Sequence, residues 1–214
     1  MNIRTVYTHL PEYEEVRDRL YCRLFNPGIM TGYTESFLSR PWMDLALCCY
    51  FEMTMFDEPG AVPVRRYFLS DWNVTEEKVF SDAWHNTEKR ERIMFCSLEE
   101  LLRELAAGEA NGKAERFPED CPLYILSSKE RQYGAVYMAS PAVLRQIARH
   151  LERNFYILPS SIHECLILPE LQGERAERLN GLVRSVNSEI VEENEILSDH
   201  VYYYDGKTGT VRIY

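Results

Sequence analysis

The alternation of hydrophobic and polar positions is clearest between residues 43 and 55. Every second residue there is strongly apolar, which is the period of a β-strand with one buried face. The apolar positions are Met43, Leu45, Leu47, Cys49, Phe51, Met53 and Met55. Turn-forming residues follow at 57–60, so the β-prone run at 62–69 is the predicted hairpin partner of this strand.

Helices are expected on both sides of this hairpin. Pro11 precedes apolar residues at positions 13, 16, 20 and 24, a spacing that predicts a helix ending near residues 26–28. Thr75 is the predicted N-cap of a second helix. Ser97 and Glu100, three residues apart, form a capping box that predicts a third.

The third helix is expected to stop at Gly108, where the composition changes. Residues 108–121 are polar and rich in helix breakers, as in a linker. We therefore expect an N-terminal lobe over residues 1–108, a linker over 109–121 and a C-terminal lobe over 122–214.

The second half of the chain is denser in predicted strands. Apolar, β-prone runs predict strands at 123–127, 135–139, 155–158, 165–168, 201–204 and 210–214. One helix begins at Ser140-Pro141, and a later one carries Leu179, Leu182, Val183 and Val186. Hairpins mixed with helices predict an α+β fold of two lobes, with mainly antiparallel sheets and helices packed on them.

Composition and charge narrow the classes of partner. The chain is 45% hydrophobic and 27% charged, which is typical of a folded globular protein. Its formal net charge of −10 argues against direct nucleic-acid binding and permits a basic partner.

The N-terminus has no continuous apolar segment, and the longest apolar run is too short to span a membrane. Six cysteines without a C-x-x-C pair are typical of reduced thiols, so we expect a cytoplasmic protein without a membrane anchor.

A short polar insert between the strands at 155–158 and 165–168 is the densest group of reactive side chains. It contains Ser160, Ser161, His163 and Glu164, which together offer a nucleophile, a base and an orienting carboxylate. Two observations weaken a catalytic interpretation. Consecutive residues on a strand point to opposite faces, and no Gly-x-Ser-x-Gly elbow exposes a serine.

A structural interpretation of the same insert is favoured. The serines would cap the turn through local hydrogen bonds. Glu164 would lie at the strand end or pair with an arginine or with backbone N–H groups, because an unpartnered carboxylate in a core is costly.

The remaining candidate residues indicate binding chemistry more weakly. His163 lacks a second histidine four residues later, and His200, after Asp199, has no ligand spacing, so we expect no metal site. The sequence contains no Gly-rich phosphate-binding loop, so we expect no cofactor. Arg145, Arg149 and Arg153 recur every four residues and are candidates for contact with phosphates or an acidic partner, although such a stripe is more often a solvated helix face, which is the favoured interpretation.

Several blocks of this sequence resemble a known family. They are Asp44-Leu45-Ala46, Trp72-x-Val-Thr-Glu-Glu77, Gly134-Ala135, Pro141-x-x-Leu144, residues 155–164, Val186-Asn187 and residues 197–204. Together they resemble domain-of-unknown-function family 5688, a bacterial family from gut Clostridia, over about residues 10–208. The Leu-Pro-Ser-Ser-Ile-His-Glu block is the most specific part.

The resemblance implies an α+β fold and brings no established activity, cofactor or catalytic residue. Members commonly carry a further N-terminal segment, which we expect to be absent or shortened here. The resemblance also implies a cytoplasmic accessory role, in some members on mobile elements.

The sequence thus favours a cytoplasmic, non-catalytic accessory protein that binds a protein partner. A more specific hypothesis is that the acidic chain occupies the nucleic-acid channel of a basic partner and inhibits it. The alternative is a hydrolase that uses Ser160 or Ser161 with His163, assisted by Asp199 or Glu164. A third hypothesis is a small-ligand sensor with its site between the two halves.

Overall fold

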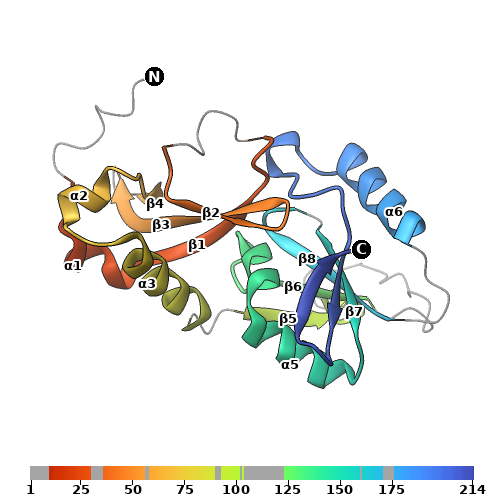
Figure 1. Cartoon of the computed structure of the whole chain (residues 1–214). Helices are drawn as coiled ribbons and strands as arrows, with labels where there is room; N and C mark the ends of the chain where they lie inside the picture. Colours follow the sequence, from red (N-terminus) through yellow and green to blue (C-terminus); the bar gives the residue numbers. More distant parts are fainter. Residues whose placement is uncertain are drawn as a thin grey trace. The chain divides into compact units, whose positions relative to one another are not determined.

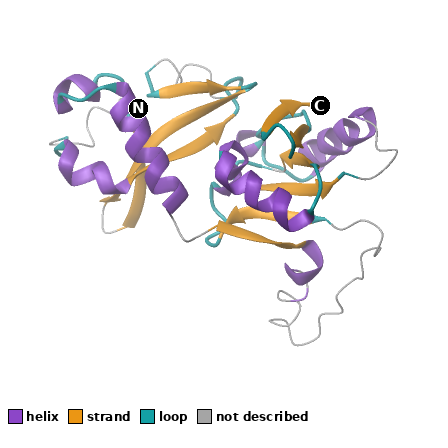
Figure 2. Ribbon diagram, turned by 60° about the horizontal axis from the view of Figure 1, so that its bottom comes forward, coloured by secondary structure: helices purple, strands orange, loops and turns teal. Residues whose placement is uncertain are grey.

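The fold was analysed in a computed structural model, which describes residues 10–29, 36–55, 58–89, 93–101, 103, 123–159, 161–170 and 176–214. The chain divides into two compact units, and both combine helices with an antiparallel sheet (Figure 2). Unit 1 comprises Met1–Cys22, Gly32–Arg40 and Cys48–Arg90, and unit 2 comprises Arg23–Thr31, Pro41–Leu47 and Glu91–Tyr214. The predicted α+β class is confirmed. The predicted linker over 109–121 lies outside the described residues, so the boundaries at 108 and 122 stay a prediction.

Unit 1 is built around one sheet, of strand order β1-β3-β2 with β4 paired to β3 (Figure 1). Its strands are β1 (Leu20–Phe25), β2 (Ser39–Trp42), β3 (Leu45–Met55) and β4 (Glu58–Pro63), and the first three run on into unit 2. Its helices are α1 (Tyr13–Val16), the 3-10 helix η2 (Arg17–Arg19), α2 (Phe68–Trp72) and α3 (Glu76–Lys89).

The β3–β4 hairpin confirms the long alternating strand, with two shifts. Met43 has a φ of 55° and belongs with Asp44 to the turn before β3. The partner strand is β4, and part of the predicted partner run forms α2.

The predicted helix from residue 13 to residue 24 is wrong beyond its first turns. Only α1 and η2 are helical, and the chain then extends into β1. Leu20, Tyr21 and Cys22 are all buried, as are Leu24 and Phe25. A strand covered on both faces carries an apolar run that also contains residues at helical spacing, so periodicity alone could not separate the two structures.

An aromatic cluster forms part of the core of unit 1. The ring of Trp72 lies 5.6 Å from that of Tyr13, 5.2 Å from that of Phe68 and 6.1 Å from that of Phe51. Its indole Nε1–H donates to the Pro11 carbonyl at 2.8 Å, so the one polar group of this buried side chain is satisfied. The predicted N-cap of α3 is confirmed, since the Thr75 hydroxyl accepts the Lys78 N–H.

Unit 2 contains a second antiparallel sheet, of order β10-β9-β7-β8-β6-β5. Its strands are β5 (Ile93–Ser97), β6 (Tyr124–Ser128), β7 (Phe155–Pro159), β8 (Glu164–Pro169), β9 (Tyr202–Asp205) and β10 (Thr210–Ile213). Its other elements are η3 (Gly134–Ala139), α5 (Pro141–Leu151), α6 (Ala176–Glu189) and η4 (Glu193–Glu195). The predicted capping box before residue 98 is present, because Ser97 and Glu100 exchange hydrogen bonds.

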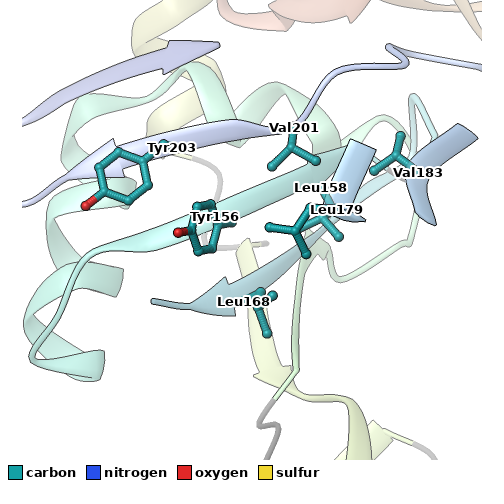
Figure 3. Close-up of a cluster of buried hydrophobic side chains, with 7 residues drawn as sticks. All are labelled: Tyr156, Leu158, Leu168, Leu179, Val183, Val201 and Tyr203. Carbon is teal, nitrogen blue, oxygen red and sulfur yellow. The ribbon is translucent and has the colours of Figure 1, made fainter. Parts of the chain in front are cut away.

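The two faces of this sheet are covered by different helices. Tyr156 and Leu158 pack with Leu179 and Val183 of α6 in one buried cluster (Figure 3). On the other face, Cys165 of β8 contacts Met138 of η3, its Sγ lying 3.5 Å from the Met138 Sδ. The sheet of unit 2 is therefore covered on both faces, which explains why β7 is buried along its whole length.

The segment at 135–139 was predicted as a strand and is the 3-10 helix η3. An added Cβ on Gly134 would lie 2.1 Å from the Ser128 nitrogen, so the backbone here packs directly against β6. Both edges of β6 are already paired, with β5 and with β8, so this segment cannot join the sheet beside it. Ser140 then caps α5 as predicted, its Oγ accepting the Val143 N–H at 3.2 Å.

Candidate functional site

The His163 imidazole lies just before β8 and contacts two other segments of unit 2. Its Nδ1 accepts the backbone N–H of Tyr133 at 3.2 Å, and its Nε2 lies 3.2 Å from Glu195 Oε1. Because Nδ1 is an acceptor, the Nε2–H group is the donor of the hydrogen bond to the Glu195 carboxylate. Tyr133 also packs on the ring, with 5.1 Å between the centroids.

The backbone of His163 is bonded on both sides as well. Its carbonyl accepts the Ser127 hydroxyl at 2.8 Å and the Gly134 N–H at 2.9 Å. Its N–H donates to Ser161 Oγ at 3.0 Å. His163 therefore joins β6, the start of η3 and the β7–β8 turn, which is an architectural role.

Ser161 acts as a local cap in this turn. Its hydroxyl accepts the His163 backbone N–H, and the residue is only 9% exposed. A general base must lie within hydrogen-bond reach of the hydroxyl that it activates, and both ring nitrogens of His163 are engaged by Tyr133 and Glu195. Ser160, the other predicted nucleophile, lies outside the described residues.

The structure also places the acidic candidates. Glu164 begins β8, and its Oε2 lies 3.6 Å from Arg131 Nη2, so the carboxylate has the arginine partner expected at a strand end. Asp199 and His200 are exposed. Asp199 Oδ1 accepts the Asn187 Nδ2–H at 2.9 Å, and the bonding partner of the imidazole is Glu195, which sequence reasoning did not single out.

Asp44 is a second residue that sequence reasoning missed. Its Oδ1 accepts the Tyr202 hydroxyl at 2.6 Å, and its Oδ2 accepts the Ser198 hydroxyl at 2.8 Å. Burial, and then this hydrogen bond, raise the pKa of Tyr202 well above its ordinary value, so the phenol stays a proton donor. In the alternating pattern Asp44 is merely one polar position of a strand.

The three predicted arginines meet at a pocket at the C-terminal end of α5. Its volume is about 520 Å³. We call it the arginine pocket, and its lining consists of Arg145, Ala148, Arg149, Glu152, Arg153, Asn154, Glu170, Tyr204, Gly206 and Lys207. The structure thus brings together all three candidate partner-binding residues and adds Lys207 from the β9–β10 turn.

Asn154 fixes one wall of the arginine pocket. Its Oδ1 accepts the Gly206 N–H at 2.9 Å, and its Nδ2 donates to Glu170 Oε2 at 3.1 Å. The Tyr203 hydroxyl donates to the other Glu170 oxygen at 3.0 Å. Both oxygens of Glu170 are therefore occupied by neutral donors, and the β9–β10 turn is attached to the end of α5.

Comparison with known proteins identifies a family. A model of a family of unknown function, DUF5688, matches residues 2–206. The chain belongs to the DUF5688 family. No curated protein and no solved structure matches it. The family resemblance expected from the sequence is confirmed.

Over the described ranges, no three His, Cys, Asp or Glu side chains are grouped as metal ligands. In that same part of the chain, every helix is too short or too polar to cross a bilayer.

No disulfide joins the described cysteines, which are Cys22, Cys48, Cys49, Cys96 and Cys165. Burial raises the pKa of the Cys48 thiol to about 12, so it is protonated and unreactive near neutral pH.

Proposed function

We propose that this protein is a non-catalytic accessory module that binds a basic protein partner through exposed residues of α6 and of the segment that follows it. The observation that carries the proposal is the exposure of Leu182, at 52%, and of Ile190, at 77%. Leu179 and Val183 of α6 are buried against the sheet and anchor the helix (Figure 3), and Leu182 lies at the border of that buried side. Leu182 lies on α6 and Ile190 directly follows its last residue, Glu189, so both offer large aliphatic side chains in solvent to a partner.

The charge around these side chains supports a basic partner. Residues 185–199 contain five carboxylates and no lysine or arginine. Glu195 is engaged by His163, whereas Glu189, Glu192 and Glu193 are exposed. We call Leu182, Ile190 and these three glutamates the α6 surface. Apolar anchors bordered by carboxylates complement a partner that presents apolar side chains among lysines and arginines.

A nucleic-acid-binding protein is the partner class that this chemistry fits best. Such proteins carry clustered lysine and arginine side chains that contact phosphates. The glutamates of the α6 surface would contact these lysines and arginines in place of phosphates. The net charge of −10 would raise the association rate through long-range attraction to a basic partner. Binding of this kind inhibits the partner by competition with nucleic acid.

A pull-down with the tagged chain, washed at low salt, tests the proposal. We expect recovery of a basic protein, with loss of recovery as salt rises. Leu182→Ser combined with Ile190→Ser should abolish capture, and Glu189→Lys with Glu192→Lys and Glu193→Lys should do the same. Ile213→Ser is the matched control, because Ile213 is a similarly exposed aliphatic residue on β10.

Inhibition of the partner is tested separately, by measuring the affinity of the partner for nucleic acid. The captured protein, once purified, should lose affinity for nucleic acid when the wild-type chain is added, and not when the Leu182→Ser, Ile190→Ser chain is added. Failure to recover any partner at low salt, or equal recovery by that double variant, would overturn the proposal.

A further inference from the structure

The arginine pocket is a concentration of positive charge in an acidic protein. Four of its lining side chains are cationic and two are carboxylates. In the part of the chain that the structure describes, no ion pair engages Arg145, Arg149, Arg153 or Lys207. Four unpaired cations around one hollow repel one another, so a bound anion would lower their electrostatic free energy.

The Tyr204 hydroxyl gives a second, independent indication of a ligand. Tyr204 lines the arginine pocket and is only 1% exposed, yet its hydroxyl oxygen is buried without a hydrogen-bond partner among the described residues. Buried tyrosine hydroxyls are normally bonded, and an unsatisfied one destabilises the fold. The ring stacks on Phe155, 4.9 Å away and 19° from parallel, and this packing helps to hold the hydroxyl where it is.

The two nearer arginines act on this hydroxyl. Burial raises the pKa of Tyr204, while the charges of Arg145 and Arg149 lower it in part. The phenol stays protonated near neutral pH and is therefore a donor. The one carboxylate close to it in sequence, Asp205, is occupied by the turn, since its Oδ1 accepts the Lys207 N–H at 2.8 Å.

We propose that the arginine pocket binds the phosphate group of a small phosphorylated molecule, held by Arg145, Arg149 and Lys207 and by a hydrogen bond from Tyr204. Planar guanidinium groups suit the oxygens of a phosphate, and the tyrosine supplies the neutral donor that fixes its orientation. Arg153 extends the positive side of the pocket past the end of α5.

Helix stability alone does not account for the arrangement. Cations in the last turn of a helix interact favourably with its negative end, which explains Arg149. Arg145 lies a full turn earlier, Lys207 belongs to another segment, and the buried hydroxyl of Tyr204 has no part in that interaction.

The size of the pocket favours a small molecule. Ligand pockets commonly measure about 300–1,000 Å³, and this one, at about 520 Å³, lies within that range. A nucleic-acid strand would contact a much longer surface, and the net charge of the whole chain, −10, opposes its binding.

Calorimetric titration of the full chain with sodium pyrophosphate tests the proposal, with sodium chloride at equal ionic strength as the blank. We expect saturable pyrophosphate binding. Arg145→Gln and Arg149→Gln should each weaken it by about tenfold or more, as for loss of a charge-assisted hydrogen bond. Tyr204→Phe should weaken it several-fold. Arg184→Gln, an exposed arginine of α6 outside the pocket lining, should bind as the wild type does.

The tyrosine variant separates binding from folding. Tyr204→Phe removes an unpartnered buried hydroxyl, so without ligand its melting temperature should equal or exceed that of the wild type. Saturation by pyrophosphate that is unchanged in Tyr204→Phe and Arg145→Gln would overturn the proposal, as would a titration that matches the chloride blank. Tighter binding of a single-stranded oligonucleotide, lost in the same variants, would overturn the small-molecule assignment. None of these results depends on the α6 surface.

Discussion

The Nδ1 atom of His163 accepts the backbone N–H of Tyr133 across 30 residues of sequence. Replacement of this histidine by alanine leaves that N–H without its acceptor, and we expect His163→Ala to lower the free energy of unfolding by about 1–3 kcal/mol. His163→Asn should lose less, because an asparagine Oδ1 can take the place of Nδ1. Urea unfolding of the three proteins measures both differences. Equal losses in the two variants would show that this hydrogen bond is not the source of the effect.

Asp44, like His163, should contribute to the stability of the fold. Asp44→Ala leaves the hydroxyls of Tyr202 and Ser198 without their carboxylate, and Tyr202 and Ser198 are both buried. We expect a loss of about 2–3 kcal/mol in the free energy of unfolding, measured by urea titration. Asp44→Asn keeps one amide oxygen as an acceptor and should lose clearly less. A variant Asp44→Ala as stable as the wild type would contradict the assignment.

Two glycines of unit 2 should respond to alanine in opposite directions. At Gly134 the new Cβ would lie 2.1 Å from the Ser128 nitrogen and 2.5 Å from the Ser127 carbonyl carbon, and neither backbone atom can move without disturbing β6. Gly134→Ala should cost about 3 kcal/mol or more. Gly181 has no atom within 4 Å of the added Cβ and lies within α6, so Gly181→Ala should gain about 0.5–1 kcal/mol. Thermal unfolding of both variants tests the pair, and a similar shift for both would refute the argument.

Asp82 on α3 should make stability depend on acid pH. Burial alone would raise the pKa of its carboxyl, but hydrogen bonds from Lys78 and from the Tyr13 hydroxyl, at 2.7 Å, lower it below the usual value of 3.8. A carboxyl whose pKa is lower in the folded chain stabilises the fold above its unfolded pKa, and this contribution disappears as pH falls through the folded pKa.

The test compares the wild type with Asp82→Asn by urea unfolding across pH. The stability difference should be constant above about pH 5 and should shrink as pH falls below about 4. Asp71→Asn is the control, since Asp71 is exposed on α2. A difference for Asp82→Asn that does not change with pH would show that these hydrogen bonds do not stabilise the ionised form.

Local sequence signals predicted the structure correctly wherever it depends on a single turn or on one buried face of an element. Ser140 caps α5, Ser97 and Glu100 form their capping box, and the apolar runs around residue 160 form the paired strands β7 and β8. These features depend on residues within a few positions of one another. The errors at residues 20–25 and 135–139 arose in runs where all residues but one, Arg23 and Ala139 respectively, are buried, because such a run fits a helix and a strand equally well.

The sequence by itself determined the α+β class, the ends of many helices and strands, and the arginine stripe of α5, since all of these depend on short-range periodicity and capping. Only the tertiary structure decided which distant residues they contact. Glu195 reaches His163 over 32 residues, and Asp44 reaches Tyr202 over 158. The β9–β10 turn carries Lys207 and Tyr204 to the end of α5. Periodicity shows which side of an element is buried, but the partner on that side depends on how distant segments pack, and no local pattern in the chain encodes that choice.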